Sequence, residues 1–247
     1  MKTLALDTTG AYLVMAVSDG ARLLAGCRRL AEAAHSELIV KTASELISAA
    51  GFSPRELQKV AAVAGPGSFT GIRIGLTFAR TISQTLDIPA VSISAFDACA
   101  LSAAVPLKDK RNLDLSISCP SVKKEGFVAD KIMVVIDALF PLVHWAVYDS
   151  SGQKKIAGPG LDNVETVSAR FAPSGKSSER WTFAGSAMAV EKTRSILSER
   201  FGGPAPTLSS RYLAPAPSAL AALAATARGG CYKILKPLYL KEVYLRK

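Results

Sequence analysis

The stretch of sequence that decides the fold reads Val63-Ala64-Gly65-Pro66-Gly67-Ser68-Phe69-Thr70-Gly71-Ile72-Arg73-Ile74-Gly75-Leu76-Thr77-Phe78-Ala79. Its glycines permit positive φ and the close approach of a neighbouring group, and Ser68 or Thr70 can cap a helix. The stretch therefore predicts a strand, a glycine-rich loop and a helix. Such a loop can hold an anion at the helix N-terminus, but the spacing matches neither common nucleotide fingerprint.

Two interpretations of the loop stay open, and we put structural capping of the helix ahead of phosphate binding. Phosphate binding would also use the end of the first strand, where Leu6-Asp7-Thr8-Thr9 occurs. The candidate phosphate or nucleotide residues are Asp7, Thr8, Thr9, Gly65, Gly67, Ser68 and Gly71.

The helix after the loop has an unusually wide apolar arc, about 200° at 100° per residue. Gly71, Gly75 and Ala79 recur every four residues inside it, so a second helix can approach closely there. The helix is either buried in its own domain or shared between its core and a partner. On the second interpretation, Gly75→Leu leaves a folded protein that has lost its partner.

A second amphipathic helix is expected over residues 36–50, with one apolar stripe. Together the two helices supply the predicted partner interface, which consists of Leu38, Thr42, Leu46, Gly71, Ile74, Gly75, Phe78, Ala79 and Ile82.

The composition is that of a globular chain, with 247 residues, 49% hydrophobic content and a net charge of +10. The N-terminal segment meets Asp7 too early for a signal peptide, and no apolar run is long enough to span a membrane. The four cysteines are widely spaced without a C-x-x-C pair. We therefore expect a cytoplasmic protein with reduced thiols and no membrane partner.

The order of predicted elements indicates two related α/β halves. Strands at 3–7, 12–18 and 22–30 open the first half, which continues as alternating helices and strands to about residue 105. A basic stretch without periodicity, 106–130, separates the halves. Asp7 and Asp19 close one strand pair twelve residues apart, as Asp137 and Asp149 do in the second half. This repeat predicts a duplication.

The domains expected from this pattern are residues 1–106 and 107–247, with the C-terminal helix and tail able to pack back on the first. The second half offers a strand near Trp181, a helix at about 189–200 and an alanine-rich helix at 218–228.

With these residues in view, the chain resembles the TsaB (YeaZ) family. Members are the non-catalytic relatives of the threonylcarbamoyl transferase TsaD in the actin-like ATPase superfamily. The resemblance is carried by Leu6-Asp7-Thr8-Thr9, His35-Ser36, residues 65–75, Ile136-Asp137-Ala138, Phe183-Ala184-Gly185 and Pro237-Leu238-Tyr239-Leu240-Lys241. It implies an α/β, actin-like ATPase (RNase H-like) fold, in two duplicated lobes each with a mixed sheet flanked by helices.

The resemblance also implies a role in making threonylcarbamoyladenosine in tRNA. Family members pair with a TsaD-type transferase through their first two helices, and a TsaE-type ATPase joins them. The implied state of the free chain is a homodimer. ATP is used by the assembled complex and no cofactor is held tightly by this chain, while tRNA is reached indirectly through the complex. Leu139 and Leu142 depart from the family, which usually has an arginine and a glutamate there.

The histidine content argues against catalysis by this chain. TsaD-like enzymes hold metal with two histidines one helical turn apart, whereas this chain has only His35 and His144. We therefore prefer a scaffold subunit, not an enzyme on its own, with no catalytic residue and no metal site. A nucleotide-binding kinase or ATPase of the actin-like superfamily, using Asp7, Asp137 and the loop, is the alternative. A tRNA-binding module ranks third, on the basic tail from Arg228 to Lys247.

Overall fold

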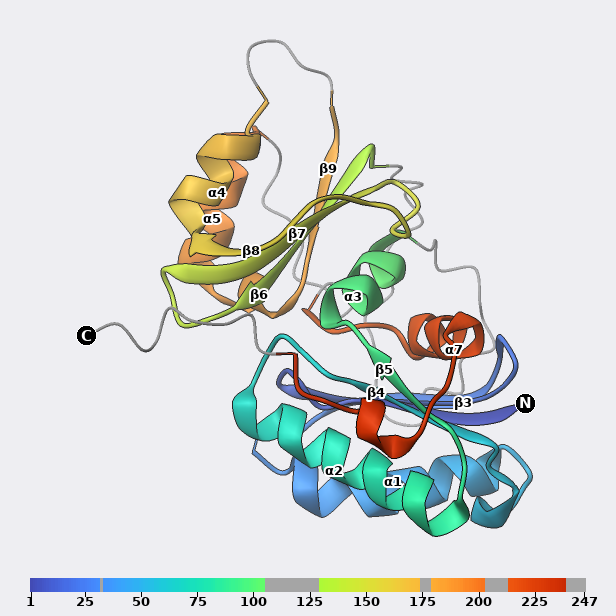
Figure 1. Cartoon of the computed structure of the whole chain (residues 1–247). Coiled ribbons are helices and arrows are strands. Elements are labelled where there is room, and N and C mark those ends of the chain that lie inside the picture. The colour runs from blue at the N-terminus through green and yellow to red at the C-terminus, as the bar shows by residue number, and fades with distance from the viewer. Residues whose placement is uncertain (32, 105–128, 174–178, 203–212, 239–247) are drawn as a thin grey trace.

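The computed structural model describes the chain except for residues 32, 105–128, 174–178, 203–212 and 239–247. Two sheets stack with a layer of helices between them, and a further helical layer covers the outer face of each sheet (Figure 1). The predicted boundary between residues 106 and 107 lies outside the described residues. Among the described residues, no helix combines the length and the apolar character that crossing a bilayer requires.

The first sheet is mixed and has the order β3-β2-β1-β4-β5. Its strands β1 and β2 form a hairpin that continues antiparallel into β3, while β4 and β5 run parallel to β1. The predicted strands are all present, and Gly20 takes the positive φ that the β2–β3 turn requires. Their bounds are β1 Lys2–Asp7, β2 Tyr12–Asp19, β3 Arg22–Leu30, β4 Lys59–Val63 and β5 Ala90–Ile93.

Helices cover both faces of this sheet. Helices α1 (His35–Ala49) and α2 (Phe69–Leu86) lie on the outer face, and α3 (Ala95–Ala104) lies on the face toward the second sheet. The short helix η1 (Pro54–Glu56) begins with a capping box between Ser53 and Glu56. Side chains alternate between the faces of a strand, so in β1 the leucines at 4 and 6 face α1 and α2, while Ala5 faces α3.

The second sheet repeats the first, with the order β8-β7-β6-β9. Its β6 pairs antiparallel with β7 and parallel with β9, just as β1 pairs with β2 and β4. The predicted duplication and the two-lobed α/β architecture are confirmed. The strands are β6 Lys131–Asp137, β7 Leu142–Asp149, β8 Lys155–Asn163 and β9 Trp181–Ala184; the helices are α4 Val164–Phe171, η2 Ser186–Ala189 and α5 Glu191–Phe201.

Two elements of the second lobe were not predicted from the sequence, β8 and α4. Strand β8 is an edge strand in which every residue is exposed or half-exposed, and Gly158-Pro159-Gly160 interrupts its hydrophobic pattern. A Cβ at Gly160 would overlap the ring of Trp145, which explains a glycine inside a strand.

The C-terminal part of the chain returns to the first lobe. Helix α7 (Pro217–Thr226) packs on β1, β2 and β3, and η3 (Tyr232–Ile234) packs on α2 and β5. The buried ammonium of Lys59 in β4 donates to the carbonyl oxygen of Ala224 at 3.0 Å, so it caps the C-terminal end of α7.

One apolar core lies between the two sheets and belongs to both lobes. It joins Ala5 of β1, Phe96 of α3, Val134 of β6 and Leu220 of α7. Buried Tyr148 of β7 donates its hydroxyl to a carboxylate oxygen of Asp97 in α3 at 2.5 Å. Each lobe therefore shares much of its buried surface with the other.

This shared core predicts that the lobes unfold together. Leu46 lies in the outer core of the first lobe and is 1% exposed, so Leu46→Ala should cost about 2–5 kcal/mol. Both tryptophans, Trp145 and Trp181, lie in the second lobe. Their fluorescence melt should nevertheless shift as far as the circular dichroism melt. Val40→Ala, at an exposed site on the same helix, is the control.

Candidate functional site

The glycine-rich loop packs against the turn that follows β1. The hydroxyl of Thr8 donates to the carbonyl oxygen of Gly71 at 2.7 Å, and the backbone N–H of Ser68 donates to the carbonyl oxygen of Thr9 at 2.7 Å. Ser68 is the N-cap of α2, as predicted, and its hydroxyl accepts from the N–H of Gly71. The loop and the turn thus satisfy each other's polar groups.

The loop and the turn can approach this closely because Gly67 and Gly71 have no side chain. A Cβ at Gly67 would overlap the backbone of Thr9, and a Cβ at Gly71 would overlap the carbonyl oxygen of Thr8. Gly67 also has a φ of 150°, within the range that favours glycine. The space that a phosphate would need between loop and turn is therefore filled by the chain itself.

Three of the N–H groups at the start of α2 already have acceptors within the chain. Those of Ser68, Gly71 and Ile72 donate to Thr9, to the Ser68 hydroxyl and to the Ser68 carbonyl oxygen respectively. An anion at a helix N-terminus binds through such groups when they are unengaged. Of the two interpretations left open, this geometry favours structural capping over phosphate binding.

Asp7 lies at the end of β1 and is 4% exposed. One of its oxygens accepts from the N–H of Thr9 at 2.8 Å. Burial raises the pKa of the Asp7 carboxyl above its ordinary value, and the hydrogen bonds with Thr9 and the nearby His35 oppose this only in part. Burial of the ionised Asp7 carboxylate therefore destabilises the folded chain, and Thr9 and His35 offset this destabilisation only in part.

A small pocket between the lobes includes Asp7. Its free volume is about 20 Å³, enough for one water molecule, whereas small-molecule sites usually offer about 300–1,000 Å³. Its lining comes from both lobes and from the approach to α7: Asp7, Thr9, Gly10, Tyr12, Ala95, Cys99, Ile136, Ser186, Leu213, Ala214 and Pro215. As it stands, this pocket does not accommodate a nucleotide.

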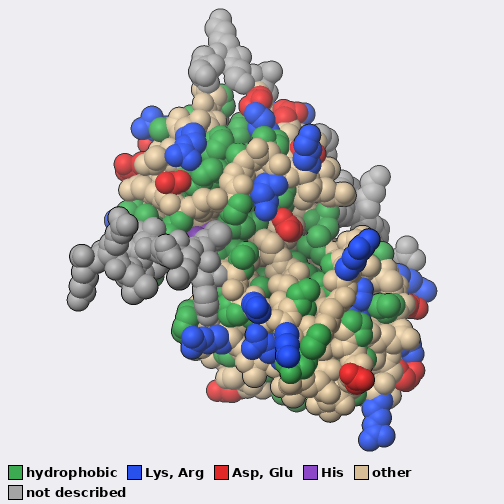
Figure 2. Space-filling view, in the orientation of Figure 1, with side chains coloured by type: hydrophobic (Ala, Val, Ile, Leu, Met, Phe, Trp, Pro, Cys, Tyr) green, Lys and Arg blue, Asp and Glu red, His purple; other side chains and the backbone are tan. Residues whose placement is uncertain are grey.

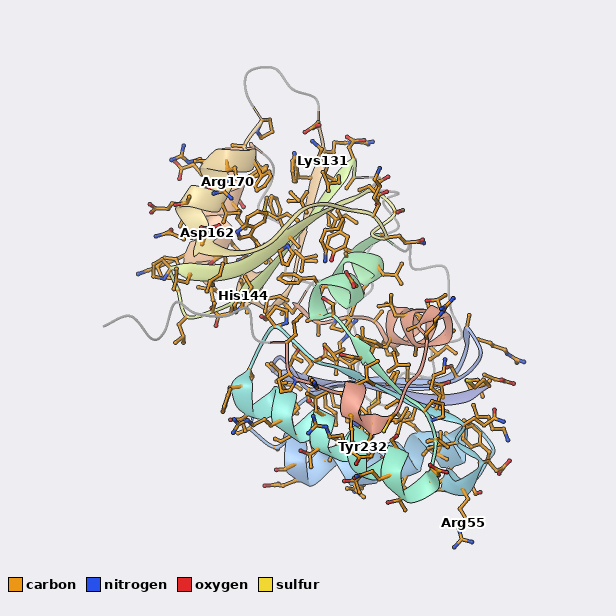
Figure 3. The ribbon with its side chains drawn as sticks, in the orientation of Figure 1. Arg55, Lys131, His144, Asp162, Arg170 and Tyr232 are labelled. Atoms are coloured by element: carbon orange, nitrogen blue, oxygen red, sulfur yellow. The ribbon has the colours of Figure 1, made fainter. Side chains whose placement is uncertain are left out.

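The two histidines lie in different lobes. His35 begins α1 and is 4% exposed, and His144 lies in β7 at the edge of the second lobe that faces the first (Figure 3). Burial lowers the pKa of His144, and Asp137 opposes that shift. Among the residues that the structure describes, no cluster of three His, Cys, Asp or Glu side chains can hold a metal ion.

The predicted partner interface divides into buried and accessible residues. Five members are buried in the first lobe itself: Thr42, Leu46, Gly71, Gly75 and Ala79. Four remain half-exposed: Leu38, Ile74, Phe78 and Ile82. Only the second group presents side chains to a partner. Val40 at 64% exposed lies on the same outer helices and was not predicted, because its position falls outside the apolar stripe of α1.

The expected role of Gly75 is wrong. A Cβ there would overlap the Thr8 hydroxyl and meet the Leu6 side chain at 3.3 Å. The glycines of α2 therefore allow β1 and its turn to pack closely on the helix. They do not face a helix of a partner. Helical periodicity identifies which residues are close-packed, but it does not identify the neighbour.

With this geometry in view, the chain can be compared with known proteins. The family model described as TsaD, tRNA N6-adenosine threonylcarbamoyltransferase, matches residues 29–225. The chain belongs to this family. Within it, the chain is similar to curated TsaB proteins, and YeaZ structures share its fold.

Individual relatives match over part of their length. The TsaB protein of Bacillus subtilis is 32% identical over 100 residues, 40% of this chain and 44% of the relative. That of Escherichia coli is 28% identical over 149 residues, 60% of this chain and 55% of the relative. The tRNA N6-adenosine threonylcarbamoyltransferase of Caulobacter vibrioides is 36% identical over 74 residues, 30% of this chain and 20% of the relative. The matches to TsaB span about half of those proteins.

The crystal structure of YeaZ from Pseudomonas aeruginosa has the same fold. It superimposes with a TM-score of 0.70 and 21% identity, covering 97% of this chain and 99% of that one. A second structure from Pseudomonas aeruginosa, described as similar to the peptidase YEAZ, gives 0.72 and 22% over the same shares. The predicted fold class is thereby confirmed over nearly the whole chain.

One difference from the TsaB pattern lies on the protein surface. The β6–β7 turn carries Leu139, which is 75% exposed with a φ of 69°, and Phe140, which is 40% exposed. Leu139, with half-exposed Leu142 at the start of β7, stands where the resemblance implies an arginine and a glutamate.

The fit between Gly75 and Thr8 predicts the effect of filling that space. Gly75→Leu should destabilise the fold by about 1–3 kcal/mol through overpacking, outweighing a helix-propensity gain of about 1 kcal/mol. Gly75→Ala should be milder, and Thr8→Ala in the same chain should recover part of the loss. Urea unfolding of the wild type, Gly75→Ala, Thr8→Ala and the double variant gives the coupling energy; additive effects would show that the side chain at 75 does not meet Thr8.

The buried carboxylate of Asp7 predicts a pH dependence. The folded-state pKa of Asp7 is raised, so the ionised carboxylate destabilises the folded chain. This destabilisation is absent below the ordinary aspartate pKa and is complete above the raised pKa. Asp7→Asn keeps the oxygen that accepts from Thr9, so it should stabilise the chain at pH 7, with the gain vanishing as the pH falls below about 4. Half-exposed Asp149, whose pKa is lowered by the Ser151 hydroxyl, should show no such gain when changed to Asn.

Proposed function

We propose that this TsaB-family chain is a non-catalytic subunit of the cytoplasmic machinery that makes threonylcarbamoyladenosine in tRNA. In this proposal it binds and activates a TsaD-type transferase. The observation that carries it is an accessible apolar face on the outer helices of the first lobe, in a chain whose family includes both TsaB and TsaD proteins.

The geometry of this face suits a helical partner. Ile74, Phe78 and Ile82 follow one another every four residues, so they line one flank of α2. Each is half-buried against the outer core and half-exposed. On neighbouring α1, Leu38 is also half-exposed and Val40 is 64% exposed. Apolar side chains at such positions mark a surface that gains stability when it is covered.

The state of the interlobe region supports an accessory role over the kinase or ATPase alternative. The Ser68 N–H donates to Thr9 of the turn, the Gly71 and Ile72 N–H groups donate to Ser68, and the pocket at Asp7 is much smaller than a nucleotide. The core between the sheets also ties the lobes together, which opposes the domain closure used by many nucleotide-binding enzymes. We therefore assign ATP use to the assembled complex and no tightly bound cofactor to this chain.

The same apolar face can also bind a second copy of the chain. In the free chain it can be covered by a second copy, which gives the homodimer, and in the complex by the transferase. A TsaE-type ATPase would then join the pair, and tRNA would be modified by the complex.

A charge placed on this face should separate binding from folding. Ile74→Lys leaves an aliphatic stem on the core and brings an ammonium group to the surface, so the chain should stay folded. Its affinity for a TsaD-type transferase should fall at least about thirtyfold, the effect of losing a central anchor residue. Calorimetric titration with the transferase and a reconstituted modification assay measure both effects.

The matched control is Ile156→Lys in β8 of the second lobe, at a site 51% exposed. It adds the same charge in the other lobe and should bind and function as the wild type does. A folded Ile74→Lys variant that binds the transferase with unchanged affinity would overturn the proposal.

A further inference from the structure

A run of positive charge crosses the first lobe where the C-terminal segment lies along α2. It consists of Arg73 and Arg80 of α2 and Arg228, Lys233 and Lys236 of the segment, and we name it the basic strip. Four of these residues are exposed and Arg80 is half-exposed. Figure 2 shows Lys and Arg side chains in a row across this part of the first lobe.

Two backbone contacts and one side-chain contact fix the segment beside α2. Gly230 pairs with Ala90 at the start of β5, Arg80 donates to the carbonyl oxygen of Leu235, and the N–H of Leu238 donates to Ala64 at the end of β4 at 2.7 Å. The segment therefore runs along the length of α2, in the opposite direction to it. Lys233 and Lys236 flank Leu235, the residue that Arg80 holds beside the helix.

The two sequences that build the strip contain no acid. No Asp or Glu occurs from Leu57 to Leu86, nor from Leu213 to Leu238. Among the described residues, none of the exposed members Arg73, Arg228, Lys233 and Lys236 forms an ion pair with a carboxylate. The positive charge is therefore not neutralised locally, as it is at Arg29, which pairs with Glu45 at 2.9 Å.

Aromatic rings accompany these cations. Phe69 is 53% exposed, and the guanidinium of Arg73 lies 3.7 Å from its ring centroid. Tyr232 lies at the start of η3 and is half-exposed beside Lys233 (Figure 3). Cations interleaved with accessible rings are typical of surfaces that contact nucleic-acid backbones and bases.

The strip is separate from the apolar flank of α2. Phe78 and Arg80 are two residues apart, so they point about 160° apart around the helix. Arg73 and Arg80 are seven residues apart and lie within about 20° of each other. One helix thus presents an apolar flank toward α1 and a basic flank toward the C-terminal segment, and both can be occupied at once.

We propose that the basic strip binds the phosphate backbone of RNA, so that this chain contacts the tRNA directly when the modification complex engages it. The proposal rests on the proposed function for the identity of the RNA, and it goes beyond the expectation of indirect contact. Backbone binding of this kind is electrostatic, tolerant of sequence and strongly dependent on salt. A strip free of acid suits a polyanion better than the mixed charges of a protein surface.

The test uses the purified full-length chain and an unmodified tRNA transcript with a fluorescent end label. The strip variant carries Lys233→Gln and Lys236→Gln, and the control carries Lys154→Gln and Lys192→Gln at exposed sites of the second lobe. Both lose the same charge. At about 0.1 M salt the strip variant should bind about tenfold more weakly, and its plot of log affinity against log salt should be shallower by about two. The control should stay within about twofold of the wild type.

Equal losses in the two variants, or an unchanged strip variant, would overturn the inference. Both variants are also titrated with the TsaD-type transferase. A strip variant that keeps its tRNA affinity but loses the transferase would assign the strip to an acidic protein surface and overturn the RNA proposal. Failure of the Ile74→Lys experiment instead removes the subunit proposal, and it leaves the tRNA affinities of the purified chain standing as measured.

Discussion

The contact between α2 and the turn after β1 is the constraint on which the first lobe depends. Thr8 reaches across to the carbonyl oxygen of Gly71, and Gly75 leaves room for the Thr8 hydroxyl one helical turn later. Since β1 is the central strand of its sheet, this contact fixes the direction of α2 beneath the whole lobe. Both outward flanks of the helix, apolar toward α1 and basic toward the C-terminal segment, take their positions from it.

Most of the fold could be predicted because its elements carry strong local signals. The Asp19-Gly20 turn, the stripe of α1 and the capping serine at position 68 each specify a structure within a few residues. The pairs of aspartates twelve residues apart indicated the duplication, since each closes a hairpin of the same length. Strand β8 carries no such signal, because an exposed edge strand needs no alternating pattern.

The site was less predictable, because its contacts join residues distant in sequence. The candidate loop residues do lie together, but no local pattern shows that Thr8 and Gly71, 63 positions apart, satisfy each other. The same holds for Gly75, whose close neighbour is a strand. Charge in the C-terminal sequence could be counted in advance, yet only its path along α2 brings it beside Arg73 and Arg80.

The return of the C-terminal segment to the first lobe has a consequence for how the chain is made. Helix α7 covers β1, β2 and β3, and Lys59 of β4 finds its carbonyl partners in that helix. These contacts span up to about two hundred positions, so the first lobe lacks one of its covering helices until residues 217–226 have been synthesised. During translation the inner face of its sheet is therefore accessible to chaperones and to other nascent chains. The order of synthesis thus exposes apolar surface to aggregation that α7 prevents in the folded protein.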